Sequence, residues 1–536
     1  MSKKDHLFEL IQSLDKSEKR YFKLAFSDQV KDKKYIKLFD VLERTEIYDE
    51  KKIKYQIKDA YLEKHYAETK YYLYQQILKV LKEYRTQHSI DNILLDKLQN
   101  IEILIQKALF DQAIKELTKA KKMAYEYERF EFVLLLITYQ NKIIVSTRLQ
   151  GFNEARLDEF WVEKKSGIKN FIDTQTARHK VLQLMESKNR IGYIKTKEDK
   201  QFYNNIKNEI EQLLQQANCS IAKMYAIESL IFYYNHIDEK KMQNYYCREL
   251  ILLHTQNPAI NASHPYQLPS AIHNLCLSEI NLLNFDAAKK WICIQKSYLQ
   301  IIQNDSEIKY KVEWSLASLQ SYFYNVSGRF DEGKNIVKEI IQWIEATDEI
   351  DQRSKWIFYG NCAEISLGAI NFNTFFYCIN KIQEYWNQID SYNKINYIIL
   401  QMFAHLYEKN IESVQYLFSF LEKEINMVRK NNPTPIEIII LEFFKKIQQH
   451  KKSDKKITEL VKETQLLLKA REHEIQTGEF EYALWLEQLL SKNSYENLVR
   501  QKRKIEIEKF IPFWNEEVEV QVDIEAFKKN LPKRIR

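Results

Sequence analysis

One short motif has residue types and spacing that match a phosphate-binding loop. Gly328, Gly333 and Lys334 fit the pattern G-x-x-x-x-G-K, in which backbone amides and a lysine hold phosphate groups. A working loop of this kind follows a buried strand and carries Ser or Thr after the lysine to bind magnesium. Here residues 316–325 have a helical pattern, and Asn335 follows the lysine. We therefore expect no nucleotide and no other cofactor at this motif.

The remaining polar clusters favour structural roles over catalysis. Asp348, Glu349 and Asp351 come just before a predicted helix, where carboxylates cap free backbone amides. His473 and Glu474 lack the second histidine of the zinc motif H-E-x-x-H, so we expect no metal site. The 8 glycines supply neither a Rossmann fingerprint nor G-x-S-x-G. We predict no catalytic residues and no enzyme activity, although a site assembled from distant helices stays open because it leaves no local motif.

Length and composition indicate a folded, all-α chain. The 536 residues exceed the usual limit of one compact core, so the chain forms several domains or an elongated array of units. Only 8 Gly and 7 Pro occur, too few for the turns of a β-sandwich or barrel, and the first proline is Pro258. Hydrophobic residues make up 45% of the chain and interleave with 29% charged residues, which argues against disorder.

The N-terminus and the cysteines favour a cytoplasmic protein. Met1–His6 leads directly into an amphipathic pattern, without the apolar core and cleavage site of a secretion signal. One of the most apolar stretches, residues 131–138, is far shorter than the ~18 residues that a membrane span needs. The 6 cysteines form no C-x-x-C pair, and we interpret them as reduced core residues.

An aromatic residue followed three positions later by a small residue recurs along the chain. In its clearest copy, Phe110 and Ala113 are followed by Leu117 and Ala120 on the same helix face. We expect the ring to close the turn between two helices and the small residue to let the second helix approach the first closely. The predicted repeat-turn positions are Phe110, Ala113, Phe152, Ala155, Phe285, Ala288, Phe330, Gly333, Phe372, Phe480 and Ala483.

The intervals between copies of this pattern are nearly constant. Phe110 and Phe152 are 42 residues apart, Phe285 and Phe330 are 45 apart, and Phe330 and Phe372 are 42 apart. A variant at Ile411 continues the series, and weaker candidates at positions 193 and 237 lie near the places where two more copies are needed. A fixed period of this length is typical of arrays of helix pairs.

The pattern over residues 95–490 resembles the tetratricopeptide repeat (TPR) family, whose units carry a small residue, an aromatic and two alanines around the same turn. The period of about 42 exceeds the ~34 residues of that family, and the Trp and Leu-Gly pair of its first helix are missing. The resemblance implies an α-solenoid of stacked antiparallel helix pairs. An irregular α-helical bundle, in which the pattern recurs by chance, is the alternative.

This interpretation divides the chain into six segments. Residues 1–95 lack the pattern, three prolines interrupt 256–270, and alternation of polar and apolar residues at 517–523 is the one convincing strand pattern. The predicted segments are an N-terminal helical cap (1–95), a first sub-array (96–255), a proline-containing loop (256–270), a second sub-array (271–430), C-terminal helices (431–510) and a short extended tail (511–536).

The predicted architecture favours binding over chemistry. Stacked helix pairs present a concave surface, lined by the first helix of each pair, that holds peptides or helices of other proteins. We therefore predict a protein–protein interaction scaffold or adaptor with a protein or peptide partner. The alternative is a regulatory protein that contacts nucleic acid through residues 1–85, which carry 20 Lys and Arg against 15 Asp and Glu. A net charge of +7 over the whole chain is a thin excess for that role.

Overall fold

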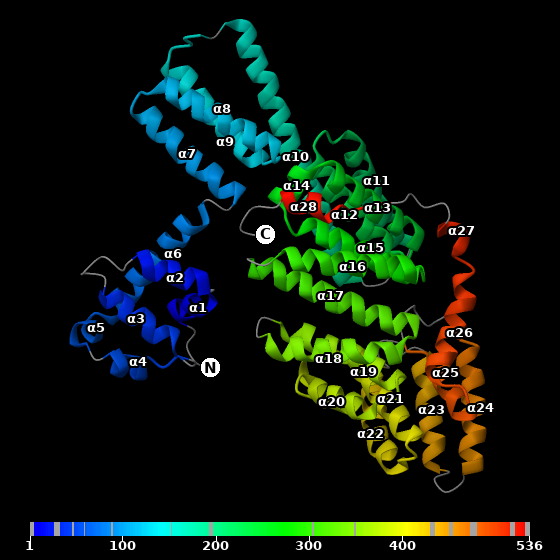
Figure 1. Ribbon diagram of the computed structural model, residues 1–536. Helices are drawn as coiled ribbons and strands as arrows, with labels where there is room; N and C mark the ends of the chain where they lie inside the picture. Colours follow the sequence, from blue (N-terminus) through cyan, green and yellow to red (C-terminus); the bar gives the residue numbers. More distant parts are fainter. Residues whose placement is uncertain are drawn as a thin grey trace. The chain divides into compact units, whose positions relative to one another are not determined.

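The computed structural model confirms the predicted all-α class (Figure 1). It describes residues 5–14, 16–25, 33–45, 48–57, 59–86, 89–151, 153–191, 197–302, 305–347, 350–428, 435–449, 454–471, 480–514 and 520–530. Within these ranges the regular elements are all helices, and none of those helices is both long and apolar enough to cross a membrane. The chain forms two compact units, Met1–Phe171 and Ile172–Leu531.

The first unit contains a helical group with its own core, followed by longer helices. Leu7, Phe39, Leu73 and Ile77 are among the fully buried residues of that core, which draws on residues 7–81. The unit continues past the predicted boundary at residue 95, because α7, α8 and α9 pack in succession. Its helices are α1 (His6–Ser13), α2 (Lys16–Ala25), α3 (Lys33–Glu43), α4 (Glu50–Ile57), α5 (Ala60–Lys64), α6 (Tyr66–Thr86), α7 (Ile90–Gln106), α8 (Phe110–Glu126), α9 (Phe130–Ser146) and the first part of α10 (Glu154–Ile191).

The described residues of the second unit are mostly helical, and many helices pack on their neighbour in sequence, such as α12 on α13 and α21 on α22. Its helices are α11 (Lys197–Gln216), α12 (Ser220–His236), α13 (Lys240–Gln256), α14 (Pro258–Ser263), α15 (Gln267–Asn281), α16 (Phe285–Ile301), α17 (Ser306–Ser327), α18 (Phe330–Ala346), α19 (Gln352–Gly368), α20 (Phe372–Gln383), α21 (Ser391–Tyr407), α22 (Ile411–Val428), α23 (Pro435–Gln449), α24 (Asp454–Lys469), α25 (Tyr482–Leu490), α26 (Tyr495–Ile507), α27 (Ile511–Trp514) and α28 (Ile524–Asn530), with the 3₁₀ turn η2 (Trp386–Gln388).

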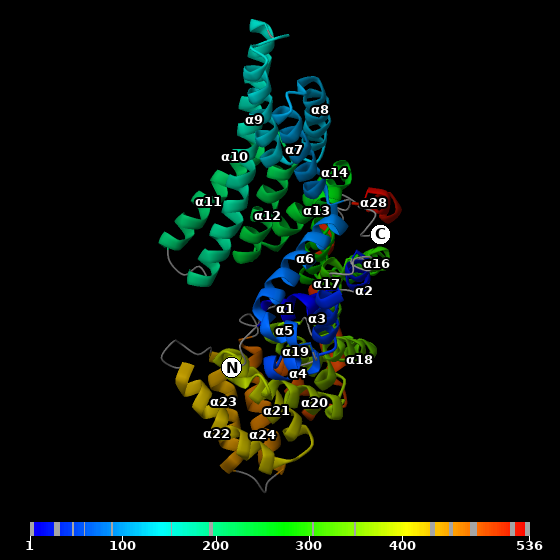
Figure 2. The same ribbon diagram turned by 90° about the vertical axis from the view of Figure 1, so that its left-hand side faces the viewer.

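Within the second unit, the first helices of successive pairs pack on one another. Helix α15 packs on α17, α17 on α19, and α19 on α21, while α16, α18, α20 and α22 each pack on the first helix of their own pair. Both views place α23 and α24 beside α21 and α22 (Figures 1 and 2). Helix α19 is buried on most sides, as its buried Trp356, Tyr359, Cys362 and Ile365 show. Helices α15, α17, α19 and α21 therefore form a row in which each helix packs on the next.

One recurring turn with a left-handed residue joins the two helices within several of these pairs. In the turn after α15, the N–H of Leu283 donates to the carbonyl of Ile280 and the N–H of Asn284 donates to that of Glu279, both at 2.9 Å. These two bonds define a Schellman motif, which satisfies the free carbonyls of a helix end. Among the described residues, the same two bonds, one from the residue with positive φ and one from the residue after it, occur at Ala108, Glu128, Arg148, Asp238, Leu283, Gly328, Ile370 and Lys409.

The predicted repeat-turn residues lie directly after these turns. Phe110, Phe285, Phe330 and Phe372 are each the first residue of a helix, as is Ile411. The positions three residues further along are buried in every case, namely Ala113, Ala288, Gly333, Phe375 and Val414. Phe480 lies two residues before α25, and Ala483 is buried in its first turn.

The small residues permit the close helix approach that the pattern predicts. A Cβ on Gly333 would lie 3.2 Å from the Tyr324 side chain on α17, the first helix of the pair, and 2.8 Å from the Ile365 side chain on α19 of the next pair. The copy at positions 152 and 155 behaves differently. Phe152 lies outside the described residues, and Ala155 is exposed in the first turn of α10. The prediction of a close approach at Ala155 is therefore wrong, because residues 153–159 are exposed.

The predicted proline loop is mostly helical. Pro258 is the first residue of α14, and Pro269 lies in the first turn of α15. Proline is tolerated at these positions because the first N–H groups of a helix have no partner within the helix and the fixed φ already suits it. The expectation of an irregular loop at 256–270 is wrong because it counted prolines without their position in a helix.

The predicted extended tail contains two short helices, α27 and α28. Phe527 on α28 is buried and its ring lies 5.0 Å from that of Tyr298 on α16. This contact anchors α28 on the second unit, so the prediction of an extended conformation throughout 511–536 is wrong. The first part of the strand pattern at 517–523 lies outside the described residues, and its described part, residues 520–523, forms no strand.

Candidate functional site

The motifs that could do chemistry are structural where the structure describes them. Gly328 is the left-handed residue of the turn after α17, with φ 65°, and Lys334 forms an ion pair with Asp331 at 2.5 Å. Asp351 caps α19, accepting from the Ser354 N–H at 2.9 Å. Asp348, Glu349, His473 and Glu474 lie outside the described residues. Across the described ranges, no three His, Cys, Asp or Glu side chains gather as metal ligands would.

The cysteines agree with the prediction in five of six cases. Cys219, Cys247, Cys276, Cys362 and Cys378 are buried free thiols, whereas Cys293 is exposed. Burial raises the pKa of Cys247 and of Cys276, so both stay protonated and unreactive at neutral pH. These side chains therefore serve as small core residues.

Two first helices, α19 and α21, line a hollow of about 500 Å³ that we call the α19–α21 hollow. The lining residues of α19 recur every three or four positions, at 353, 356 or 357, 360 or 361, and 364, so they share one helix face. The lining residues are Arg353, Trp356, Ile357, Gly360, Asn361, Glu364, Gln388, Asp390, Asn393, Asn396 and Tyr397. They include four amide side chains and no Ser, Cys or His. Such a lining can donate and accept hydrogen bonds but contains no pairing of nucleophile and base.

Polar contacts between neighbouring helices hold the amides of the hollow in place. The Asn396 amide donates to the Glu364 carboxylate at 3.3 Å, and the Asn361 amide donates to the Ser321 hydroxyl on α17 at 3.1 Å. The Tyr482 hydroxyl on α25 donates to the Asn396 carbonyl oxygen at 2.6 Å. Glu364 on α19 and Tyr482 on α25 thus fix the orientation of Asn396.

A close approach of α21 to α19 forms the base of the hollow. A Cβ on Gly360 would lie 2.3 Å from the Tyr397 hydroxyl, so only glycine fits there. Tyr397 is buried, and burial raises its pKa, which keeps the hydroxyl protonated. The base of the hollow therefore presents a neutral phenol.

The charges at the rim of the hollow are mixed. Arg353 is exposed, and among the described residues its guanidinium has no hydrogen-bond or ion-pair partner. Glu364 already accepts from Asn396, and Asp390 accepts from the Asn393 amide at 2.7 Å. Arg353 is thus the charged group of the lining that is available to a ligand, and it would favour a carboxylate.

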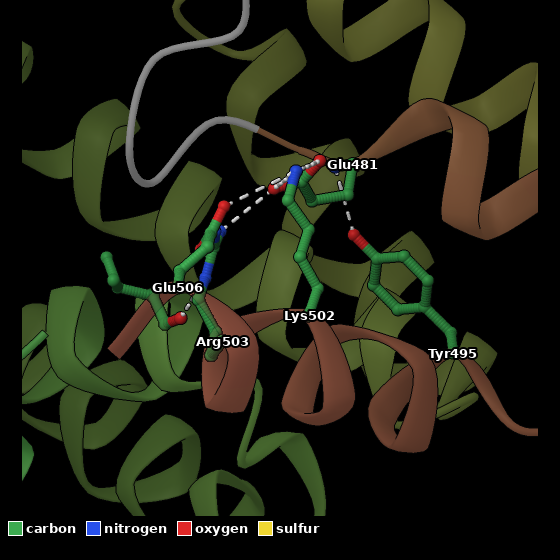
Figure 3. Close-up of polar contacts among 6 residues, drawn as sticks. Glu481, Tyr495, Lys502, Arg503 and Glu506 are labelled. Atoms are coloured by element: carbon green, nitrogen blue, oxygen red, sulfur yellow. Dashed lines mark hydrogen bonds and ion pairs between the residues drawn. The ribbon is translucent and has the colours of Figure 1, made fainter. Parts of the chain in front are cut away.

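A buried ion network fixes the segment that carries Tyr482 (Figure 3). Arg503 on α26 donates to Glu481 at 2.9 Å and to the carbonyl of Val326 at 2.9 Å, and it also pairs with Glu506 at 2.6 Å. Lys502 donates to both oxygens of Glu481 at 2.9 Å. Arg503 and Glu481 are only 5% and 4% exposed.

The same network joins the C-terminal helices to the middle of the second unit. The Glu481 N–H donates to the Tyr495 hydroxyl at 3.1 Å, and the Tyr495 ring stacks on Phe330 with centroids 5.3 Å apart. Glu496 accepts from the backbone N–H of Asp331 at 2.8 Å, which caps the start of α18. Helix α26 is thereby held against the turn between α17 and α18, and Tyr482 is held beside the hollow.

Comparison with known proteins found no matching family model, no matching curated protein and no matching solved structure.

Proposed function

We propose that this chain is a cytoplasmic protein–protein interaction scaffold of TPR-like type, which binds an extended segment of a partner protein in the α19–α21 hollow. The observation that carries the proposal is that the hollow is lined by the first helices of two successive pairs and is rich in amide side chains. Its volume of about 500 Å³ falls within the ~300–1,000 Å³ of ligand pockets.

The spacing of the turns supports an α-solenoid of stacked pairs. In the second unit the left-handed residues Asp238, Leu283, Gly328, Ile370 and Lys409 follow one another at intervals of 45, 45, 42 and 39 residues. These intervals resemble the period of about 42 that the sequence predicts. The packing of α15, α17, α19 and α21 on one another is what such a stack requires.

An extended peptide suits the chemistry of the hollow. A side-chain amide carries both a donor and an acceptor, so Asn393 and Asn361 can each pair with the backbone of an extended segment. Arg353 would bind an acidic side chain or a terminal carboxylate of that segment, and Ile357 offers an apolar contact. Main-chain bonds would supply affinity and Arg353 would supply selectivity.

Photo-crosslinking tests the proposal directly. A photoreactive residue at Ile357 should crosslink to a defined segment of a partner protein in the native cell, whereas one at the exposed Asn335 of α18 should not. A peptide copy of that segment should bind the purified chain, and Arg353→Ala and Asn393→Ala should each weaken binding about tenfold. Asn335→Ala is the matched control and should bind like wild type. Equal crosslinking from both positions would contradict the proposal.

Ion pairs of two lysines in the described N-terminal helices weigh against the nucleic-acid alternative. In the N-terminal helices, Lys23 pairs with Asp40 and Glu43, both at 2.7 Å, and Lys54 pairs with Glu50 at 2.7 Å. Lysines neutralised in this way contribute little to a phosphate-binding track. Strong, steeply salt-dependent binding of the chain to generic RNA or DNA would reverse this conclusion.

A further inference from the structure

The first turns of α10 present an apolar face that the first unit does not cover. Leu157, Trp161 and Ile168 lie within about 40° of one another around the helix and are 36%, 50% and 37% exposed. Val162, about 100° further round from Trp161, is 65% exposed. The neighbouring face of the same helix is buried, because Phe160 is buried and Gly167 packs against Val133 on α9. A Trp at the centre of an exposed apolar stripe marks an interaction surface.

The charges beside this stripe are arranged in a complementary order. Asp158 and Lys165 are seven residues apart, so they lie on the same side of the helix, next to Trp161 and Ile168. Among the described residues neither Asp158 nor Lys165 has an ion-pair partner, and the Lys165 ammonium lies 5.1 Å from the centre of the Trp161 ring. An acidic group therefore precedes the Trp and a basic group follows it.

We infer that this face of α10 binds the same face of a second copy of the chain, with the two helices antiparallel. If the pair is centred between Trp161 and Val162, Asp158 of each copy lies level with Lys165 of the other, since 158 and 165 are equally distant from the centre. The two-fold axis forms this ion pair twice.

The order of the charges along α10 favours the antiparallel pair over a parallel pair. In a parallel pair, Asp158 would lie level with Asp158 and Lys165 with Lys165, which is repulsive. In the antiparallel pair, Leu157 comes within about one helical turn of Ile168 on the other copy, so the apolar side chains meet on one side of the ion pairs. Only the antiparallel arrangement pairs the opposite charges and also brings the apolar side chains of the two copies together.

A charge reversal and its compensation test this inference on the full chain. Sedimentation equilibrium of wild type should show a mass that rises with concentration toward twice 64.6 kDa. Asp158→Lys alone and Lys165→Asp alone should each weaken self-association at least about tenfold, because like charges then meet twice. The double variant, Asp158→Lys with Lys165→Asp, should recover to within about threefold of wild type, because it recreates both pairs with the signs exchanged.

Two further variants keep the test independent of folding. Trp161→Glu should abolish self-association, whereas Lys122→Asp, a charge reversal at an exposed position of α8, should leave it unchanged. Circular dichroism should show equal helix content for all variants. A wild-type chain that stays monomeric at every concentration would overturn the inference, as would a double variant no better than the single ones.

Discussion

Replacing Arg503 with methionine is the sharpest test of how the C-terminal helices are held. The change keeps most of the side-chain stem but removes the donors to Glu481, Val326 and Glu506. Glu481 is then a buried carboxylate with Lys502 as its remaining ion-pair partner. Breaking a buried pair costs ~3–5 kcal/mol, and because Lys502 remains we expect a loss of about 3 kcal/mol.

Hydrogen exchange at α26 measures this loss locally. A chain with two compact units does not unfold in a single step, so a global melting curve would not isolate the effect. A loss of about 3 kcal/mol corresponds to a more than about hundredfold fall in the protection of the α26 amides, since about 1.4 kcal/mol is a factor of ten. The amides at the turn between α17 and α18 should lose protection together with α26, because Val326 loses its donor.

The matched control is Arg500→Met on the same helix. Arg500 is half exposed and pairs with Glu496 one helical turn away, a contact worth ~0.5 kcal/mol or less. Arg503→Lys should fall between the two, because lysine keeps the charge without the planar fork. A fall in protection of less than about threefold in Arg503→Met would show that aromatic packing around Tyr495 alone holds α26.

Three further outcomes follow from the structure. Gly368→Ala should cost ~1–3 kcal/mol, seen as faster exchange in α18 and α19, since a Cβ would lie 2.5 Å from the Phe330 ring. Burial lowers the pKa of His254 to about 4, so below pH ~6.5 the unfolded chain binds a proton that the folded chain does not, and the free energy of unfolding falls. Between pH 7 and pH 5 this loss is ~2 kcal/mol, and His254→Gln should remove it from the acid-induced loss of α13 protection. Asp351→Ala should cost ~1 kcal/mol at the start of α19.

The turns within the helix pairs were predictable because the residues that mark them are close together in the sequence. The ring at Phe285 and the small residue at Ala288 lie within one helical turn, so helical geometry alone assigns their roles. The sequence does not reveal the left-handed residue of each turn. In seven of the eight Schellman turns among the described residues, this position holds a residue other than glycine, such as Leu283 or Ile370, although a side chain there costs ~1–2 kcal/mol. Packing between helices supplies that energy, and a sequence does not display it.

The ion network around Arg503 was invisible for a different reason. Its partners Glu481 and Val326 are 22 and 177 residues away, so no local pattern links them. The proline segment failed because the same residue type has opposite effects at the start and in the middle of a helix, and its position was not known. The missed ion network and the wrong prediction for the proline segment both depend on the tertiary arrangement, which a local sequence pattern does not contain.

The α19–α21 hollow escaped prediction because its contacts do not follow the period of the turns. The left-handed residues Gly328, Ile370 and Lys409 are 42 and 39 residues apart, whereas the contacts from Ser321 to Asn361 and from Glu364 to Asn396 span 40 and 32. Measured from each turn, the contacting residue therefore shifts toward the helix N-terminus by two residues at the first step and by seven at the second. Helices that cross at an angle require such a shift, because the rows of side chains that meet are inclined to the helix axes. If the sequence repeats are aligned on their turns, the contacting polar residues fall at different positions of the repeat. Such an alignment therefore does not show that these side chains meet in the fold.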